Sequence, residues 1–261
     1  GDPPAGGFVS ENARDDAGLV APPDGALAVV RTLHTQGYEA YLVGGCVRDR
    51  FLVRAVNDWD VATDAEPETV LDLFERTIPT GLQHGTVTVM QGKMPIEVTT
   101  YRVEVGYSDG RRPDVVHYTR VLEDDLSRRD FTVNAMAWDP SSGRIVDPFH
   151  GRQDLTDRSI RAVGRARERF DEDGLRALRA VRFACVLDFS VDPETWAAIP
   201  ATMGTFRRVS AERIRVEFMK IVDSPRIGWG VNALRDSGLL AEFLPEVAGI
   251  GDAEWSEVVA L

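Results

Sequence analysis

Two aspartates one residue apart carry the clearest chemical signal in this sequence. Asp58 and Asp60 lie in NDWDVAT, residues 57–63. On a strand, residues two apart share a face, and carboxylates held together raise each other's pKa. Mg²⁺ would offset that repulsion, because it takes one or two carboxylates and completes its shell with water and phosphates. A solvated turn is the alternative. Glu97, on a later predicted strand, is a candidate third ligand, with a salt bridge as its own alternative.

A paired-glycine turn precedes the aspartates. GGCVRD, residues 44–49, follows a short apolar run and opens a predicted helix. Gly44 and Gly45 would let backbone N–H groups approach an anion closely, and Arg48 could reach the same anion. A tight turn without a ligand is the ordinary alternative. The short spacing from Arg48 to Asp58 makes a combined phosphate and metal site the more specific hypothesis.

The arginines are unevenly distributed. The net charge of −12 argues by itself against a nucleic-acid partner. Between residues 158 and 182, however, the sequence has eight arginines and only four acidic residues. In the whole chain, lysine occurs only at positions 93 and 220. A guanidinium grips phosphate or a base edge in a way that an ammonium cannot. Codon bias explains the preference for arginine but not the clustering, so this segment is a candidate for phosphate or base recognition.

Composition limits the class of protein. With 261 residues, 43% hydrophobic and 28% charged, the chain has the profile of a globular protein of one large or two modest domains. No apolar run approaches 18 residues, and the N-terminus lacks the order of a signal peptide, so we expect no membrane span and a cytoplasmic location. Cys46 and Cys185 are predicted to be buried free thiols, with no zinc site.

Hydrophobic periodicity predicts an α+β fold. Helices are predicted at 25–37, 47–55 and 66–77, strands at 39–43, 57–63, 86–91 and 95–104, and a hairpin turn at 91–95. Further on come a long loop at 106–125, a Ser-capped helical turn at the start of 127–139, a short strand in 143–155, and helical patterns at 170–187, 210–223 and 227–243. These patterns predict a flexible tail (1–20), a mixed α/β domain (21–158) and an all-helical domain (159–261).

Five motifs in order resemble one family. GGCVRDRFLVRAVNDWDVAT (44–63) is similar to the first motif of the class II tRNA nucleotidyltransferases, the CCA-adding enzymes, and of bacterial poly(A) polymerases. The later motifs resemble, in turn, the family's ribose motif (RRDFTVNAMAWD, 128–139), its head-to-neck connection (DPFHGRQDL, 147–155, then IRAVG), its nucleobase-selecting helix (EDGLRALRAVRFA, 172–184) and its last neck motif (VSAERIRVEFMKI, 209–221). The resemblance covers roughly residues 25 to 245.

The resemblance implies a fold and a set of roles. The fold would be a polymerase-β-like nucleotidyltransferase head, with a small mixed sheet flanked by helices, followed by a helical neck. The implied roles are catalysis and the binding of two Mg²⁺ ions (Asp58, Asp60), phosphate binding (Gly44, Gly45, Arg48), ribose or nucleotide contact (Arg129, Asp130, Asn134), base selection (Asp173, Arg176) and completion of the nucleotide pocket (Arg179, Arg182).

Helix geometry makes the base-selecting role specific. At 100° per residue, Asp173 and Arg176 lie on one side of this helix, opposite Leu178, Val181 and Cys185. A carboxylate beside a guanidinium matches the amine and ring nitrogen of cytosine and adenine, and mismatches the carbonyl edges of uracil and guanine. A nearly neutral surface salt bridge is the alternative. Arg182 projects nearer the apolar side of this helix.

The implied reaction is template-independent addition of CMP and AMP to the 3′ end of tRNA, from CTP and ATP with release of pyrophosphate. Segment 106–125 resembles the family's flexible loop, whose loss goes with enzymes that add only cytidines, and HGTVTV (84–89) resembles the CCA-adding form. We expect neither DNA nor membrane as a partner.

Three other functions stay open at this stage. They are an A-adding enzyme or poly(A) polymerase, a catalytically silent RNA- or nucleotide-binding module, and nucleotidyl transfer to a small molecule such as an antibiotic. Two departures from the family pattern are visible. Phe51-Leu52-Val53 replaces Leu-Leu-Gly, and the family's body and tail domains are expected to lie outside a chain that stops at Leu261.

Overall fold

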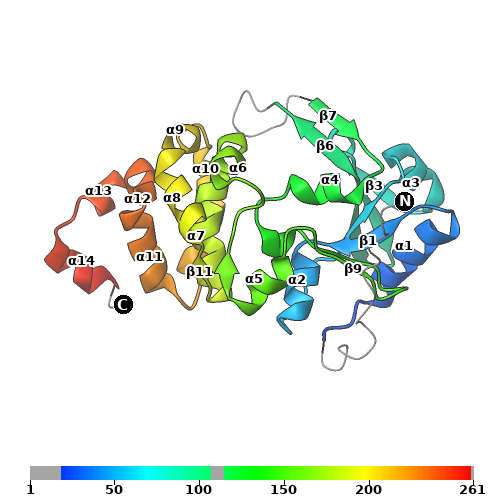
Figure 1. Cartoon of the computed structure of the whole chain (residues 1–261), viewed down its shortest axis with the longest axis horizontal. Coiled ribbons are helices and arrows are strands. Elements are labelled where there is room, and N and C mark those ends of the chain that lie inside the picture. The colour runs from blue at the N-terminus through cyan, green and yellow to red at the C-terminus, as the bar shows by residue number, and fades with distance from the viewer. Residues whose placement is uncertain (1–18, 107–114, 260–261) are drawn as a thin grey trace, which may run out of the picture. The chain divides into compact units, whose positions relative to one another are not determined.

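The computed structural model describes residues 19–106 and 115–259 (Figure 1). The chain divides into two compact units. The first unit contains the residues up to Tyr101 together with 120–122 and 136–147, and the second contains 102–119, 123–135 and 148–261. The predicted domain boundary near residue 158 does not coincide with the boundaries of these compact units. The functional domains 21–158 and 159–261 therefore stay a prediction.

The first unit is built on a mixed seven-stranded sheet in the order β3-β4-β5-β2-β1-β8-β9. Its strands are β1 (Ala40–Val43), β2 (Asp60–Thr63), β3 (Thr77–Gly81), β4 (Thr86–Gln91), β5 (Met94–Thr100), β8 (Ala137–Trp138) and β9 (Ile145–Val146). Only the β2–β5 pair is parallel among them. The helices are α1 (Asp24–Thr35), α2 (Gly45–Phe51) and α3 (Pro67–Leu73), with a 3₁₀ turn η1 (Leu82–His84).

Helix α1 covers this sheet because its apolar residues recur at helical spacing. Ala26, Val29, Val30 and Leu33 are all fully buried, and α1 contacts β1, β2, β4 and β5. The helix ends before Gly37, whose φ of +85° favours glycine.

The second unit is mainly helical. Its early part contains β6 (Arg102–Val105), β7 (Val115–Tyr118), α4 (Leu122–Ser127, all but its first residue), η2 (Thr132–Asn134), α5 (Gly151–Thr156) and β10 (Ser159–Ile160). The later part contains α6 (Ala166–Glu172), α7 (Leu175–Leu187), β11 (Ser190–Val191), α8 (Pro193–Ala201), α9 (Met203–Phe206), α10 (Ala211–Val222), α11 (Ile227–Asp236), α12 (Leu239–Phe243), α13 (Pro245–Ala248) and α14 (Asp252–Val259).

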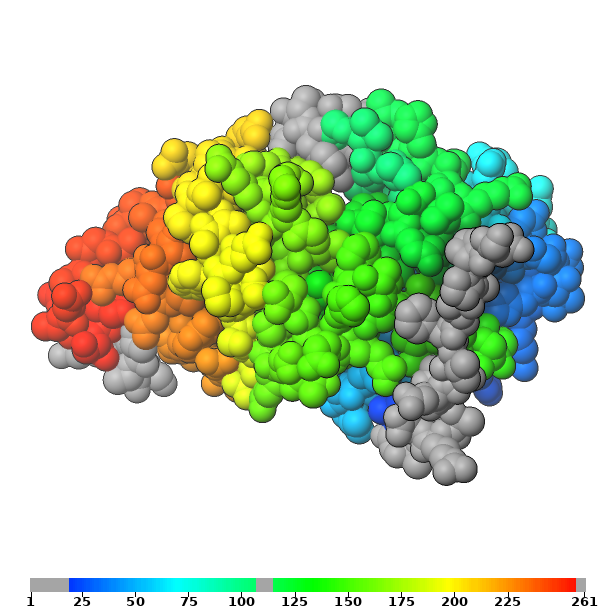
Figure 2. Space-filling view, in the orientation of Figure 1, coloured from blue at the N-terminus to red at the C-terminus, as the bar shows by residue number. Residues whose placement is uncertain are grey.

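Helix α7 is the centre of this unit. Most of its residues are buried, and it packs against α6, α8, α10 and α11. Phe131 contacts Phe183 of α7 and Phe170 of α6 edge to face, at 5.6 and 6.4 Å between ring centroids. This packing fixes the segment that precedes η2 against the two helices. The helices from α8 onward form one continuous surface, yellow to red in Figure 2.

The predicted α+β class is confirmed, as are most elements of the first unit. The helices predicted at 25–37, 47–55 and 66–77 correspond to α1, α2 and α3, and the strands predicted at 39–43 and 86–91 to β1 and β4. The hairpin turn at 91–95 contains Gly92 with φ +63°. Cys46 and Cys185 are buried free thiols as expected, and burial raises the pKa of the Cys185 thiol to about 11.

The strand predicted at 57–63 begins only at Asp60, so that expectation was wrong for Asp58. Asp60 pairs with Val43, the last residue of β1. The chain turns away at Gly44, so residues before Asp60 have no β1 partner. Trp59, between the two aspartates, lies in the core, with an exposed fraction of 6%.

The long strand predicted at 95–104 is two strands in different sheets. Buried Tyr101, whose N–H donates to Thr63 O at 2.8 Å, separates β5 from β6. The loop predicted at 106–125 contains β7, which pairs with β6, and the start of α4. Val115, His117 and Tyr118 of β7 are all exposed, so β7 has no buried apolar face that would give its sequence a strand period. Residues 107–114 of the loop and 1–18 of the predicted tail lie outside the described residues.

Three helical expectations were also wrong in detail. Ser127 does not cap a following helix but ends α4, and its Oγ donates to Asp124 O at 2.7 Å. The helix predicted over 170–187 breaks after Glu172 and resumes at Leu175. The helix predicted at 210–223 is confirmed as α10, whereas 227–243 is divided into α11 and α12 at Gly238, whose φ is +82°.

Four elements lie where the sequence predicted a different structure or none. Edge strand β3 contains Pro79, and two-residue strands β10 and β11 pair in the otherwise helical part, where strand signals were expected to vanish. Helix α5 occupies a segment that was expected to be a turn. Of the helices that the structure describes, none is long and apolar enough to cross a membrane.

Candidate functional site

The glycine turn between β1 and α2 has a conformation that requires glycine. Gly44 has φ +74° and ψ −132°, and its N–H donates to Met136 O at 3.2 Å. Arg48 folds back over this turn, because its Nη2 lies 3.6 Å from where a Cβ on Gly45 would stand. The Arg48 guanidinium also donates from Nε and Nη2 to Asp49, at 2.9 and 2.8 Å. The three residues predicted to bind phosphate therefore lie together.

The strand register places Asp60 beside this turn. Asp60 is the Cα partner of Val43, which immediately precedes Gly44, and on its other side it is the partner of Glu97 in β5. Asp60 is half-buried, while Asp58 and Glu97 are exposed. The sheet thus brings Asp60 next to the glycine turn. Asp58 lies outside the strand, two residues before Asp60 in the chain.

The donors present at this edge fit magnesium. They are carboxylates, which are hard oxygen ligands, and Mg²⁺ binds through one or two such groups plus water and phosphates. Within residues 19–106 and 115–259, no group of three or more acidic, histidine or cysteine side chains is arranged to hold a metal ion. Asp58 and Asp60 suffice for the magnesium pattern, and Glu97 as a third ligand stays a prediction.

In the second unit, Asp130 is the centre of another group of residues that were predicted to act on the nucleotide. Its Oδ2 accepts from Arg179 Nε and Nη2 at 2.8 and 2.6 Å, and its Oδ1 accepts from Asn134 Nδ2 at 3.1 Å and Phe131 N at 2.8 Å. Burial opposes ionisation of this carboxyl, but the Arg179 guanidinium and the Asn134 amide outweigh burial and hold its pKa well below its usual range. Three residues predicted to contact the nucleotide form one bonded group.

Arg129 belongs to a neighbouring ionic cluster. Its Nη2 donates to Asp125 Oδ2 at 3.3 Å and its Nη1 to Asn134 O at 3.5 Å, whereas its buried Nε has no partner. Asp125 is fully buried and also pairs with Arg128 at 2.8 Å. Despite its burial, the pKa of Asp125 is lowered by Arg128 and Arg129.

Arg182 is held differently from Arg179. Its Nε donates to Glu217 Oε2 of α10 at 2.7 Å, and its guanidinium lies 3.5 Å from the Phe183 ring centroid. Arg179 also approaches Glu217, at 3.6 Å. Burial disfavours the charged form of Glu217, yet Arg182 and Arg179 hold its pKa below its usual value. Arg182 is 8% exposed, which agrees with the apolar position inferred from the sequence.

Asp173 and Arg176 lie at the corner between α6 and α7 but take different partners. The Asp173 carboxylate accepts hydrogen bonds from both terminal nitrogens of Arg213, at 3.1 and 2.7 Å, and from the Leu175 N–H at 3.1 Å. Arg176 pairs with Glu172 at 2.5 Å, and its other nitrogen donates to Arg128 O at 3.0 Å. Asp173 has φ −140°, outside helical geometry, so the continuous helix assumed in the sequence argument is wrong.

The local positive charge expected at 158–182 is balanced by acids from elsewhere in the same unit. All eight arginines form ion pairs, and the partners that lie outside this segment are Asp130, Asp154, Asp188, Asp192 and Glu217. The clustering therefore marks a network of ion pairs rather than an open basic surface.

Sequence reasoning missed Arg213 and Glu217 as members of this network. They are four residues apart on α10, so they lie on one side of that helix. A glutamate at a position that the helical pattern buries is the signal that could have found them.

The comparisons with known proteins agree with this geometry. Residues 40–161 match the family described as "Poly A polymerase head domain", and residues 188–250 match "Probable RNA and SrmB- binding site of polymerase A". The CCA-adding enzyme of Enterococcus faecalis (strain ATCC 700802 / V583) is 49% identical over 197 residues, which are 76% of this chain and 48% of that protein.

Two solved structures are also similar. The CCA-adding enzyme of Bacillus stearothermophilus in complex with CTP has a TM-score of 0.79 at 42% identity, covering 86% of this chain and 54% of that one. A tRNA nucleotidyltransferase complexed with a primer tRNA and an incoming ATP analogue has a TM-score of 0.73 at 27% identity, covering 89% of this chain and 66% of that one.

The fold and the site therefore define a nucleotidyltransferase head followed by a helical RNA-binding region, in a class of enzymes that is typically metal-dependent. The chain belongs to the family of the CCA-adding enzymes and poly(A) polymerases. It spans about half the length of the curated relatives it matches.

Proposed function

We propose that this protein adds CMP and AMP to the 3′ end of tRNA, from CTP and ATP and without a template. The observation that carries the proposal is the register that places Asp60 beside the glycine turn and its arginine, Arg48. Relatives named CCA-adding enzymes, at 45–49% identity, favour this function over the alternatives of A-addition and poly(A) synthesis. The cytoplasm is the location proposed for this reaction.

In this proposal each candidate site residue of the first unit has a defined task. Gly44, Gly45 and Arg48 bind the triphosphate and orient its α-phosphate toward the 3′ hydroxyl of the RNA. Asp58 and Asp60 hold two Mg²⁺ ions, which when bound stabilise the attacking and leaving oxygens of the displacement. The 3′ hydroxyl loses its proton to solvent and its oxygen forms a bond to the α-phosphorus. The bond from the α-phosphorus to the bridging oxygen breaks, and pyrophosphate leaves.

The second unit is assigned nucleotide recognition. Asp130, fixed by Asn134 and Arg179, accepts from the ribose hydroxyls, and Arg129 lies next to it. Asp173 and Arg176 select cytosine and adenine by their shared pattern of an amine donor beside a ring-nitrogen acceptor. Because Asp173 is held by both nitrogens of Arg213, its carboxylate has a fixed plane, and its remaining lone pairs accept from the base.

The intact pair of Asp58 and Asp60 argues against the hypothesis of a catalytically silent binding module, because such a module has no need of two carboxylates so close together. The match of residues 188–250 to an RNA-binding description opposes transfer to a small molecule.

Incorporation assays with one nucleotide at a time test the proposal. The protein is incubated with tRNA lacking the CCA end, tRNA ending in C74 and tRNA ending in C75, each with a single nucleoside triphosphate and Mg²⁺. We expect CMP to be added to the first two primers and AMP only to the third. Addition of AMP alone, to any primer and in long runs, would instead identify a poly(A) polymerase.

A further inference from the structure

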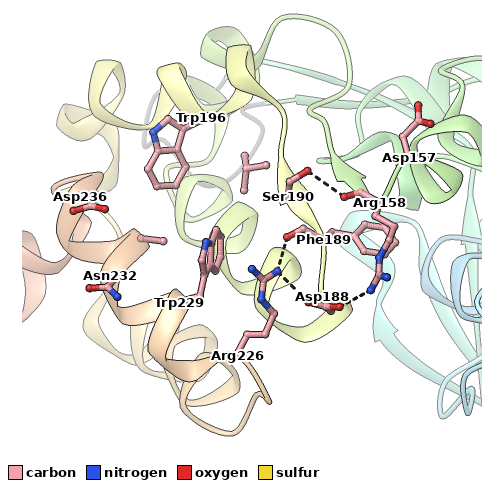
Figure 3. A pocket seen from close by; sticks show the side chains of 12 residues that line it. Asp157, Arg158, Asp188, Phe189, Ser190, Trp196, Arg226, Trp229, Asn232 and Asp236 are labelled. Carbon is pink, nitrogen blue, oxygen red and sulfur yellow. Dashed lines mark hydrogen bonds and ion pairs between the residues drawn. The ribbon is translucent and has the colours of Figure 1, made fainter. Parts of the chain in front are cut away.

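A cavity of about 600 Å³ lies in the second unit, among residues to which no role in nucleotidyl transfer has been assigned (Figure 3). Trp196 of α8 and Trp229 of α11 form its aromatic walls. Both indoles are half-buried, so each retains ring surface that a ligand can contact. The Arg226 guanidinium lies 4.7 Å from the ring centroid of Trp229, on the side of that ring turned toward Asp188 in Figure 3.

One end of the cavity offers hydrogen-bonding groups. Asn232 Oδ1 accepts from Trp255 Nε1 at 2.7 Å, which fixes the amide and leaves its NH₂ group as a donor. Asp236, exposed and one helical turn further along α11, supplies carboxylate acceptors. A fixed amide donor near a carboxylate acceptor suits the edge of a nucleobase, which presents both kinds of group.

The opposite end is formed by two arginines that share one carboxylate. Arg158 Nη2 contacts Asp188 Oδ2 at 2.5 Å, and Arg226 Nη1 lies 3.3 Å from Asp188 Oδ1. Arg226 also donates to Phe189 O at 3.0 Å. The second acid at this end, Asp157, accepts from Gln153 Nε2 at 2.9 Å and points away from the Arg158 guanidinium in Figure 3. The guanidiniums therefore keep donors for an anion.

We propose that this cavity binds one unpaired nucleotide of the RNA substrate. Its base stacks on Trp196 and Trp229, its edge faces Asn232 and Asp236, and its phosphate lies at the arginine end. The order of base-edge groups, aromatic rings and guanidiniums matches the order of parts in a nucleotide. A nucleotide within RNA is favoured over a free one because most of the cavity falls within residues 188–250, which match an RNA-binding description.

This inference rests on the proposed function, since it takes RNA as the substrate. The experiment compares Trp196→Ala and Trp229→Ala with the unaltered protein, using tRNA that lacks its CCA end. We expect each variant to weaken tRNA binding roughly tenfold, because stacking of one base on an aromatic side chain is worth about that much. In incorporation assays the KM for tRNA should rise by the same factor, while kcat and the KM for CTP stay unchanged.

Three controls keep the test specific. Trp196→Phe and Trp229→Phe retain a stacking ring and should retain affinity, which separates stacking from loss of packing. Phe243→Ala removes an aromatic side chain of α12 that does not line this cavity and should leave tRNA affinity unchanged. Thermal unfolding of every variant identifies those that do not fold.

The outcomes distinguish this inference from the proposed function. Unchanged tRNA affinity in both Trp→Ala variants, with normal incorporation, would overturn the cavity assignment alone. Binding of free AMP that depends on Trp196, with no effect of the same variant on tRNA, would also overturn it. If the protein incorporates no nucleotide but binds tRNA in a manner that requires both tryptophans, the cavity assignment stands and the proposed function fails.

Discussion

At the scale of single residues, Asp130 carries the densest set of contacts in the candidate site. Two nitrogens of Arg179, the Asn134 amide and the Phe131 N–H all donate to its carboxylate. Such contacts stabilise the ionised form, so the pKa of Asp130 is lower in the folded protein than in the unfolded chain. This carboxylate therefore links nucleotide recognition to the stability of the second unit.

The stability of the protein should depend on pH through this residue. The pKa of Asp130 in the folded protein lies below the unfolded value of 3.8. Its contribution to the free energy of unfolding is therefore complete above about pH 5 and is lost progressively as the pH falls below about 5. Asp130→Asn should lower the free energy of unfolding by about 3 kcal/mol at pH 7, because Arg179 loses its charged partner. It should also flatten the acid dependence. Urea unfolding at pH 7 and at pH 3 measures both effects.

Glu168→Gln is the matched control, since Glu168 pairs with Arg165 on the surface, where both side chains are more than 60% exposed. That substitution should change stability by less than about 1 kcal/mol. An Asp130→Asn variant as stable as the wild type at pH 7 would contradict the role assigned to the Asp130–Arg179 pair.

The sequence indicated which residue types would form the site but not their partners. Asp58, Asp60, Gly44 and Arg48 could be selected because their types and spacing already specify a chemistry. The partner of Asp173 could not be selected, because Arg213 lies forty residues away and reaches it only through the packing of α10 on α7. Long-range ion pairs leave no local pattern in the sequence.

At the scale of elements, the corner between α6 and α7 determines where Asp173 points. Gly174 lies at this corner, packed against Thr205 and Phe206, the last two residues of α9. A Cβ there would lie 2.6 Å from backbone atoms of Thr205 and Phe206. Backbone cannot move aside as a flexible side chain can, so only glycine allows this close approach. The corner and α9 are thereby held at a fixed distance.

Gly174→Ala should therefore displace the corner. We expect a loss of about 1–3 kcal/mol in the free energy of unfolding, typical of overpacking, together with weaker discrimination between CTP and UTP. Gly204→Ala, in α9 itself, is the control, because a Cβ at that position meets nothing within 4 Å. Its helical position predicts unchanged or slightly increased stability. Equal effects of the two substitutions in denaturant unfolding would refute the close-packing argument.

The type of an element could be predicted where one of its faces is buried. The prediction failed where burial is not periodic. Helix α1 shows its buried stripe in the sequence, and so does α10. The corner at Asp173 was missed because apolar residues continue at helical spacing on both sides of it. The β6–β7 hairpin was missed because Val105 and Val115, cross-strand partners, are both about half exposed. Asp58 was placed on a strand because alternation alone does not reveal where β1 ends.

At the scale of the whole molecule, the proposed tasks divide between the two compact units. The acids proposed to bind magnesium and the glycine turn belong to the first unit, whereas the residues proposed to select the base belong to the second. We therefore expect that substitutions can impair nucleotidyl transfer and base selection separately. Side chains of one unit can be changed without altering the core of the other.

The most direct test measures incorporation of each of the four nucleoside triphosphates by the wild type, Asp58→Ala, Asp60→Ala and Asp173→Ala, with matched tRNA primers and Mg²⁺. We expect that both first-unit variants fold normally and incorporate no nucleotide. We expect that Asp173→Ala still incorporates nucleotides but no longer favours CTP and ATP over UTP and GTP. Substantial magnesium-dependent activity in Asp58→Ala or Asp60→Ala, or wild-type selectivity in Asp173→Ala, would contradict these expectations.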